Sequence, residues 1–219
     1  MTAPLLVLVR PRSPDNLVSI AWAMKTFGFH DWVAVISQVH FTHMQQVVQM
    51  RFTPDEAAMV ATLRRVESLD EAVAGREIVV GTTMREFAGK PRMTPRELAL
   101  YQAHSEASWA LVFGAESNGL TGDDVKSCNA LSFIPTHPDQ PSVNLSQAVV
   151  LYAYEMHAAK TSAATLVDVR ELRALRETIA HSVRERGISR RTADELVAPL
   201  VRAELTREER ALHEEAWSA

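Results

Sequence analysis

Residues 111–120, which read LVFGAESNGL, join an apolar run to a loop of small polar residues. The pattern returns at residues 130–136 (ALSFIPT), and residues 141–156 (PSVNLSQAVVLYAYEM) open with another polar loop before a strongly periodic apolar stretch. Buried strands that end in small polar loops are typical of an open α/β sheet, which binds ligands at the carboxyl ends of its strands. This stretch therefore predicts an α/β fold with a small-molecule site at one edge of the sheet.

Strand and helix patterns alternate through the first 160 residues. Apolar runs predict strands at residues 4–10, 32–37, 77–83, 109–114 and 130–136. Periodic or capped segments predict helices at residues 16–27, 52–66, 69–74, 94–102 and 142–160. Residues 38–52 are hard to assign, and residues 84–93 are interpreted as a charged loop. The alternation predicts a mostly parallel sheet with helices on both faces.

Helix boundaries carry specific signals. Gly28 is expected to end the helix that starts near Asn16, because glycine adopts the left-handed conformation of a helix C-terminus without strain. Thr53 is expected to cap the next helix, with a proline at the first helical position. Thr94 and Glu97 have the spacing of a capping box, in which each side chain bonds the other residue's backbone N–H.

The character of the chain changes at about residue 161. Strand signals vanish, and ten arginines and eleven acidic residues follow at helical spacing. We therefore expect an α/β domain over residues 1–160 and a helical extension over residues 161–219. The extension is interpreted either as a solvated surface that packs on the domain or on a second copy, or as a docking element for a partner or RNA.

Composition and charge exclude several classes of protein. The 47% hydrophobic content allows a sizeable core, and a net charge of −4 with a pI near 6.1 argues against a nucleic-acid binder that relies on overall charge. The amino-terminal run is too short for a signal peptide, and no window is apolar enough for a membrane span. A cytoplasmic location is the simplest expectation.

Metal and thiol chemistry have little support in the sequence. Cys128 is the one cysteine, which excludes an intrachain disulfide and a cysteine-rich metal site. His30, His40 and His43 lack metal-ligand spacing, so we expect no metal. Cys128 has no histidine nearby to activate it and is predicted to be a buried helix residue.

Each polar loop, taken singly, has a simple structural interpretation. The glycines of GAESNGL fit a tight turn, and their spacing matches neither a dinucleotide fingerprint nor a phosphate loop. Ile134 and Pro135 can mark a strand end. Ser142 and Asn144 can cap the helix that follows.

The loops as a set, however, resemble the SPOUT (trefoil-knot) RNA methyltransferases. FGAESNGL, the pair Ile134-Pro135 and SVNLSQAV match the motifs of the 2′-O-ribose branch in order and separation, and residues 13–29 (SPDNLVSIAWAMKTFGF) resemble its asparagine-bearing first motif. EIVVGTTMRE, RMTPREL and the tail LVRAELTREERALHEEAW are most similar to the TrmJ-type tRNA methyltransferases. The resemblance covers almost the whole chain and is weakest at residues 38–66 and 161–195.

The resemblance implies a knotted, Rossmann-like α/β domain in which the C-terminal segment passes through a loop, and it implies S-adenosyl-L-methionine as the cofactor. It assigns the cofactor to three loops, whose residues here are Thr82, Thr83, Met84, Gly114, Glu116, Gly119, Leu120, Ile134, Ser142, Val143, Asn144 and Leu145. It also implies a homodimer that completes each site across helix 142–160 and the helix after Asn16.

The implied reaction is methyl transfer from a sulfonium to a ribose 2′-hydroxyl, which must be oriented and its charge stabilised. The resemblance assigns catalytic roles to Asn16, Arg85, Ser142 and Asn144. The family places an arginine six residues after the asparagine, and here that residue is Trp22. Val18 likewise replaces a family glycine.

Three functions follow from these residues. The first is ribose 2′-O-methylation of RNA, with tRNA as the expected substrate, in which Arg85 or Arg10 replaces the missing arginine. The second is a cofactor- or RNA-binding homologue with lost or altered catalysis, because indole offers a single N–H. The third is methylation of another RNA nucleophile. A basic cluster of Arg85, Lys90, Arg92 and Arg96 fits either a phosphate-binding patch or an ordinary exposed loop.

Overall fold

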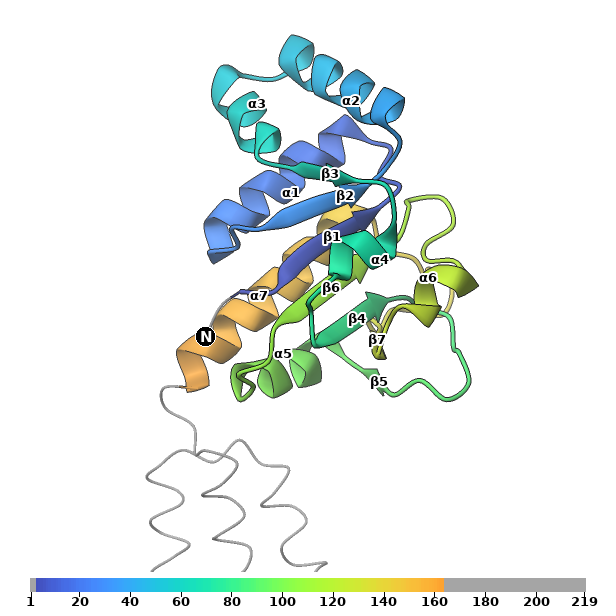
Figure 1. Ribbon diagram of the computed structural model, residues 1–219. Helices are drawn as coiled ribbons and strands as arrows, with labels where there is room; N and C mark the ends of the chain where they lie inside the picture. Colours follow the sequence, from blue (N-terminus) through green and yellow to red (C-terminus); the bar gives the residue numbers. More distant parts are fainter. Residues whose placement is uncertain (1–2, 164–219) are drawn as a thin grey trace, which may run out of the picture. The chain divides into compact units, whose positions relative to one another are not determined.

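The computed structural model describes residues 3–163, with side chains to residue 160. Most of the predicted helical extension, residues 164–219, lies outside this range. The strands are β1 (Leu5–Val9), β2 (Trp32–Val35), β3 (Arg64–Val66), β4 (Ile78–Thr82), β5 (Arg92–Met93), β6 (Trp109–Phe113) and β7 (Ala130–Ser132). They form one seven-stranded parallel sheet in the order β3-β2-β1-β6-β4-β7-β5 (Figure 1), which confirms the predicted parallel α/β fold.

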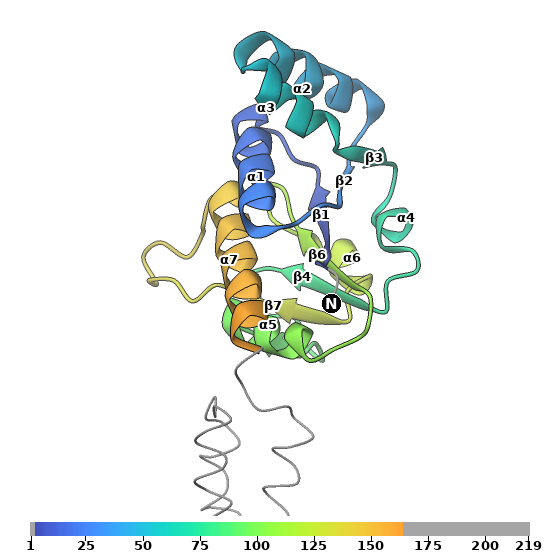
Figure 2. The same cartoon turned by 90° about the vertical axis from the view of Figure 1, so that its left-hand side faces the viewer.

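Helices cover both faces of the sheet. They are α1 (Pro14–Phe27), α2 (Gln38–Arg51), α3 (Pro54–Ala61), α4 (Leu69–Val73), α5 (Pro95–Ala103), α6 (Gly122–Lys126) and α7 (Leu145–Ala163). Figures 1 and 2 show α4 and α6 on one face of the sheet and α1, α5 and α7 on the other. α2 and α3 pack against α1 and against each other.

Side chains of the central strands alternate between the two faces. Leu5, Val7 and Val9 of β1 join a buried cluster with Leu69 of α4 and Val125 of α6. Every residue of β1 and β6 is buried. Strands that are covered on both sides need apolar residues at every position, which explains why these runs are continuous rather than alternating.

The opposite face is packed with aromatic side chains. Phe113 of β6 meets Tyr152 of α7 edge to face, with ring centres 5.4 Å apart. Trp109 of the same strand meets Tyr101 of α5 at 5.7 Å. These contacts fix α5 and α7 on the face that does not carry α4 and α6.

Several helix boundaries confirm the sequence predictions. Gly28 ends α1 with φ of 74°, the left-handed conformation that glycine tolerates. Thr53 forms a capping box with Glu56 at the start of α3, and Thr94 forms one with Glu97 at the start of α5. These signals depend on residues three or four apart, so they can be recognised without knowledge of the rest of the fold.

Other boundaries differ from the predictions. The predicted helix 52–66 ends at Ala61, and residues 64–66 form β3 at one edge of the sheet instead. Residues 92–93 of the predicted charged loop form β5 at the other edge. The unassigned stretch 38–52 contains α2. The long helix starts at Leu145, three residues later than predicted, because Asn144 caps it from outside.

The order of the strands decides where a ligand site can form. β4 lies between β6 and β7, and Thr82 pairs with Phe113 on one side and with Ser132 on the other. The carboxyl ends of these three strands are therefore neighbours, and so are the loops that follow them. The passage of the chain through a knot stays a prediction. No helix within residues 3–163 is long and apolar enough to cross a membrane.

Candidate functional site

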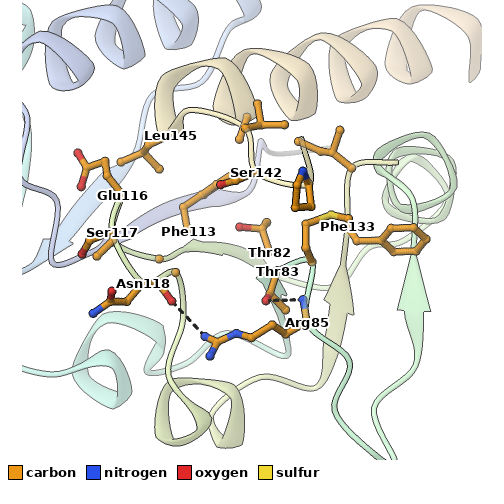
Figure 3. Close-up of a pocket in the computed structure, with 18 of the residues that line it drawn as sticks. Thr82, Thr83, Arg85, Phe113, Glu116, Ser117, Asn118, Phe133, Ser142 and Leu145 are labelled. Carbon is orange, nitrogen blue, oxygen red and sulfur yellow. Dashed lines mark hydrogen bonds between the residues drawn. The ribbon is translucent and has the colours of Figure 1, made fainter. Parts of the chain in front are cut away.

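A cavity of about 380 Å³ opens where β4, β6 and β7 end (Figure 3). The loops after these strands and the first turns of α7 form its walls. Its lining residues are Thr82, Thr83, Met84, Arg85, Phe113, Gly114, Ala115, Glu116, Ser117, Asn118, Gly119, Phe133, Ile134, Pro141, Ser142, Val143, Leu145, Ala148 and Tyr152. The volume falls in the range of small-molecule and cofactor sites.

The loop after β4 is held to both neighbouring strands. The Thr82 hydroxyl donates to the Val112 carbonyl at 3.0 Å, and the Thr83 backbone N–H donates to the Ser132 carbonyl at 2.9 Å. The Thr83 hydroxyl accepts the backbone N–H of Arg85 at 3.1 Å, which closes a tight turn. These bonds fix the backbone of Thr82 and Thr83 at the base of the cavity.

The loop after β6 folds back tightly on itself. The Gly119 N–H donates to the Ala115 carbonyl at 2.8 Å, and Gly119 has a φ of 63°. A Cβ on Gly114 would come within 2.1 Å of the Gly119 carbonyl carbon, so no side chain fits there. Both glycines are therefore required by the turn itself, which brings loop backbone to the edge of the cavity.

The Glu116 carboxylate ties this loop to the start of α1. It accepts the backbone N–H of Arg12 at 3.1 and 3.2 Å, the backbone N–H of Ser13 at 3.1 Å, and the side-chain amide of Asn16 at 3.0 Å. Asn16 is buried beneath the loop. Glu116 and Asn16 thus form a bridge between the cavity loop and α1.

Arg85 connects the loops after β4 and β6. Its Nη2 donates to the carbonyls of Asn118, at 3.1 Å, and Leu120. Figure 3 shows the side chain reaching from beside Thr83 toward Asn118. Within the described residues its Nε and Nη1 make no hydrogen bond, so these N–H groups are free to donate to a ligand.

The loop after β7 and the start of α7 close the cavity. Ile134, Val143 and Leu145 give it an apolar wall, and Ser142 lies on the same side (Figure 3). The Tyr152 hydroxyl donates to the Ser132 hydroxyl at 2.8 Å. Burial raises the pKa of Tyr152 far above its ordinary value, so this side chain is a neutral part of the wall.

Ten of the twelve predicted cofactor residues line the cavity, and so does Arg85. Leu120 is fully buried in the core below the loop and reaches Arg85 only through its carbonyl. Asn144 lies outside the lining, where its Oδ1 accepts the Ser146 backbone N–H at 2.9 Å and the Gln147 backbone N–H at 3.4 Å as the cap of α7. Asn16 reaches the cavity only through Glu116.

Eight lining residues were not predicted from the sequence: Phe113, Ala115, Ser117, Asn118, Phe133, Pro141, Ala148 and Tyr152. Ser117 and Asn118 lie within GAESNGL, so their polarity could have predicted that they line the cavity. Tyr152 was interpreted as a packing residue, which is confirmed, but it also lines the cavity. Phe113 and Phe133 carried no signal beyond their strands.

Trp22 and Arg10 are both engaged away from the cavity lining. The Trp22 indole N–H donates to Glu56 of α3 at 3.3 Å, and its side chain is 46% exposed. Arg10 forms a two-bond ion pair with Asp124. Burial raises the pKa of Asp124, but the bonds from Arg10 and Thr121 outweigh it and lower the pKa overall. Of the two arginines considered as replacements for the family residue, Arg85 alone lines the cavity.

The predicted basic cluster is largely paired within the protein. Lys90 donates to the Cys128 carbonyl at 2.5 Å, and Arg92 is bonded to Glu86 and to the Met84 carbonyl. Arg96 also has a partner. These contacts favour a structural role over a phosphate-binding patch. Cys128 is buried as predicted, but it lies just after α6 rather than in it. No cluster of three metal-ligating side chains occurs in the described part of the chain.

A parallel α/β sheet with a cavity built from three loops at adjacent strand ends, next to a helix N-terminus, defines a small-molecule-binding domain of the methyltransferase type predicted above. The chain belongs to the SpoU rRNA Methylase family, whose model matches residues 3–154. A tRNA (cytidine/uridine-2′-O-)-methyltransferase TrmJ of Yersinia enterocolitica is 35% identical over 173 residues, which cover 76% of this chain and 66% of that protein.

Solved structures share the fold. The crystal structure of TrmJ from Z. mobilis ZM4 has a TM-score of 0.61 and 25% identity, and covers 99% of this chain and 98% of that one. An AdoMet-bound rRNA methyltransferase from Sinorhizobium meliloti has a TM-score of 0.53 and 19% identity, and covers 72% of this chain and 61% of that one. The chain spans less than two thirds of the length of the curated relatives it matches first, 66% for the Yersinia protein.

Proposed function

We propose that this protein transfers the methyl group of S-adenosyl-L-methionine to a ribose 2′-hydroxyl of RNA, with tRNA as the substrate. One observation carries the proposal: the three loops that the family uses for the cofactor converge on one cavity at the ends of β4, β6 and β7. Membership of a methylase family and the 35% identity to a tRNA 2′-O-methyltransferase support the same reaction and substrate.

The walls of the cavity suit the cofactor. Ile134, Val143 and Leu145 provide apolar surface for a purine ring, and the tight turn at Gly114 and Gly119 brings backbone donors and acceptors to the rim. When bound, S-adenosyl-L-methionine supplies an electrophilic methyl group on a positively charged sulfonium. The residues of this chain supply its binding, its orientation and the exclusion of water.

The residues around the cavity can orient a hydroxyl more readily than deprotonate it. Among the lining residues, the single carboxylate is that of Glu116, and it already accepts four hydrogen bonds. The free N–H groups of Arg85 can contact a phosphate or stabilise charge that develops on the attacking oxygen. Ser142 lies across the cavity from Arg85 (Figure 3), and its hydroxyl can also donate to a ligand.

A homodimer is part of the proposal. Val150, Leu151 and Tyr154 of α7 are exposed apolar side chains, and Tyr154 packs edge to face on Phe27 at the end of α1. Exposed apolar surface that spans two helices marks a protein interface more often than a solvated face. It lies on the two helices that the family resemblance assigns to the dimer.

Binding and transfer can be measured separately. Calorimetry with S-adenosylhomocysteine is expected to give a dissociation constant in the micromolar range, roughly −8 kcal/mol. Tritiated S-adenosyl-L-methionine is expected to label tRNA at a ribose 2′-oxygen, located by nucleoside mass spectrometry of RNA from a deletion strain and its parent. Cofactor binding without label in any cellular RNA would reject the methyltransferase function.

Trp22 favours a second candidate, a homologue that binds cofactor or RNA but has lost catalysis. Its indole is bonded to Glu56, so the family arginine has no counterpart at this position. The Trp22→Arg variant separates the two functions. If catalysis has been lost, methyl transfer appears only in the variant. If Arg85 has taken over, the wild-type protein turns over at a rate comparable with that of the variant.

A further inference from the structure

Arg92 contacts two walls of the cavity without lining it. Its guanidinium carbon lies 4.2 Å from the centre of the Phe133 ring, and its Nη2 donates to the Met84 carbonyl at 3.2 Å. Phe133 belongs to the loop after β7 and Met84 to the loop after β4, and both line the cavity. One side chain therefore joins two of the three loops that make the site.

The guanidinium is held by stacking as well as by hydrogen bonds. Its side chain is 21% exposed, and Nη1 donates to Glu86 at 2.5 Å. Its Nε is buried without a hydrogen-bond partner. A buried N–H without a partner opposes this position, so the contact with the Phe133 ring must contribute to holding the group there. The ammonium group of lysine is not planar, so it cannot stack on the Phe133 ring and donate to both Glu86 and the Met84 carbonyl as the guanidinium does.

The backbone next to Arg92 converges on the same loop. β5 is only two residues long and lies at the edge of the sheet. The Met93 carbonyl accepts the Ser132 hydroxyl at 2.8 Å and the Phe133 N–H at 3.0 Å. Such a short strand gains little from its own ladder, so the side-chain contacts of Arg92 add to these backbone bonds in attaching it.

We propose that Arg92 is a positioning residue for the methyl donor: it holds Phe133 and Met84 in the arrangement that binds S-adenosyl-L-methionine and takes no part in the transfer. The proposal rests on the function proposed above. A cavity wall that makes the same contacts with the cofactor in the ground state and in the transition state stabilises both states equally. Loss of Arg92 is therefore expected to raise KM for the cofactor and to leave kcat unchanged.

Arg65 provides a closely matched control. It lies on β3, the short strand at the other edge of the sheet, and its side chain is 20% exposed. It donates to Glu67 at 2.6 Å and to the Ile36 carbonyl at 3.2 Å, as Arg92 does to a glutamate and a carbonyl. It differs from Arg92 because neither of its partners lines the cavity.

The test compares the Arg92→Met, Arg92→Lys and Arg65→Met variants with the wild-type protein. Calorimetry is expected to show S-adenosylhomocysteine bound about tenfold more weakly by both Arg92 variants, in the range of a lost cation–π contact. Their kcat should stay within about twofold of wild type, and Arg65→Met should bind as wild type does. Wild-type affinity in Arg92→Met, or an equal loss in Arg65→Met, would overturn the proposal.

Hydrogen exchange of the ligand-free proteins separates this proposal from the function on which it rests. Amides of residues 82–86 and 131–136 are expected to exchange faster in Arg92→Met than in wild type or Arg65→Met. Equal exchange in all three proteins would overturn the positioning role. A wild-type protein that binds no S-adenosylhomocysteine would reject the methyl donor, whereas faster exchange confined to these loops would still support the positioning of the cavity walls.

Discussion

The Glu116 carboxylate shows how one side chain can serve the fold and the site together. It accepts hydrogen bonds from Arg12, Ser13 and Asn16, and it stands in a loop that lines the cavity. The Glu116→Gln variant places an amide N–H₂ against these donors. A buried donor that is left without an acceptor lowers the free energy of unfolding by about 1–3 kcal/mol. We expect denaturant unfolding to show a loss of that size together with weaker cofactor binding. Glu106→Gln, at an exposed residue, should change neither.

The buried thiol of Cys128 is expected to make the free energy of unfolding depend on pH. Burial raises the pKa of its thiol from 9.0 to about 11, with a smaller opposing effect from Lys90. Because the folded pKa lies above the unfolded one, this contribution to stability is complete below pH 9 and is lost between about pH 9 and 11. The unfolding free energy of wild type should therefore fall more steeply over this window than that of Cys128→Ala. A parallel fall in the two proteins would contradict the prediction.

Substitutions of Asn144, at the start of α7, can distinguish a helix-capping role from a catalytic one. Asn144 Oδ1 accepts two backbone N–H groups at this end, and Asn144 does not line the cavity. Asn144→Ala should cost about 1 kcal/mol of stability through loss of the cap. Asn144→Asp keeps the acceptor and suits the positive end of the helix dipole, so it should retain both stability and methyl transfer. Loss of transfer in a stable Asn144→Asp protein would restore the predicted catalytic role.

The elements that the sequence failed to reveal have a common physical cause. β3 and β5 contain Arg64, Arg65 and Arg92, and strands at the edges of a sheet need not be apolar. β1 and β6, buried on both faces, could be predicted from their apolar runs alone. Within the site, glycines and small polar residues mark a ligand loop in the sequence. Phe113 and Phe133 do not, because an aromatic residue becomes a cavity wall only through the contacts of the folded sheet.

The charge of the whole molecule bears on how RNA is bound. The net charge of −4 does not attract a polyanion, so the proposed RNA substrate requires basic groups that are local. Arg85 is the cation that lines the cavity among the described residues, and most of the neighbouring basic side chains are paired with the protein itself. One chain therefore supplies few unpaired cations near the cavity. This favours a second copy of the chain as the source of further contacts to the proposed RNA substrate.

The proposed dimer gives the last prediction. Leu151 on α7 is 41% exposed and belongs to the apolar surface assigned to the interface. A glutamate there would be buried without a partner in the dimer, so Leu151→Glu should sediment as a monomer of 24.3 kDa rather than at twice that mass. Methyl transfer should fall with it, because the proposed dimer completes each site across its interface. Val39→Glu, at a 78% exposed position on α2, should stay dimeric and active. A wild-type protein that sediments as a monomer yet methylates RNA would rule out the dimer as a requirement.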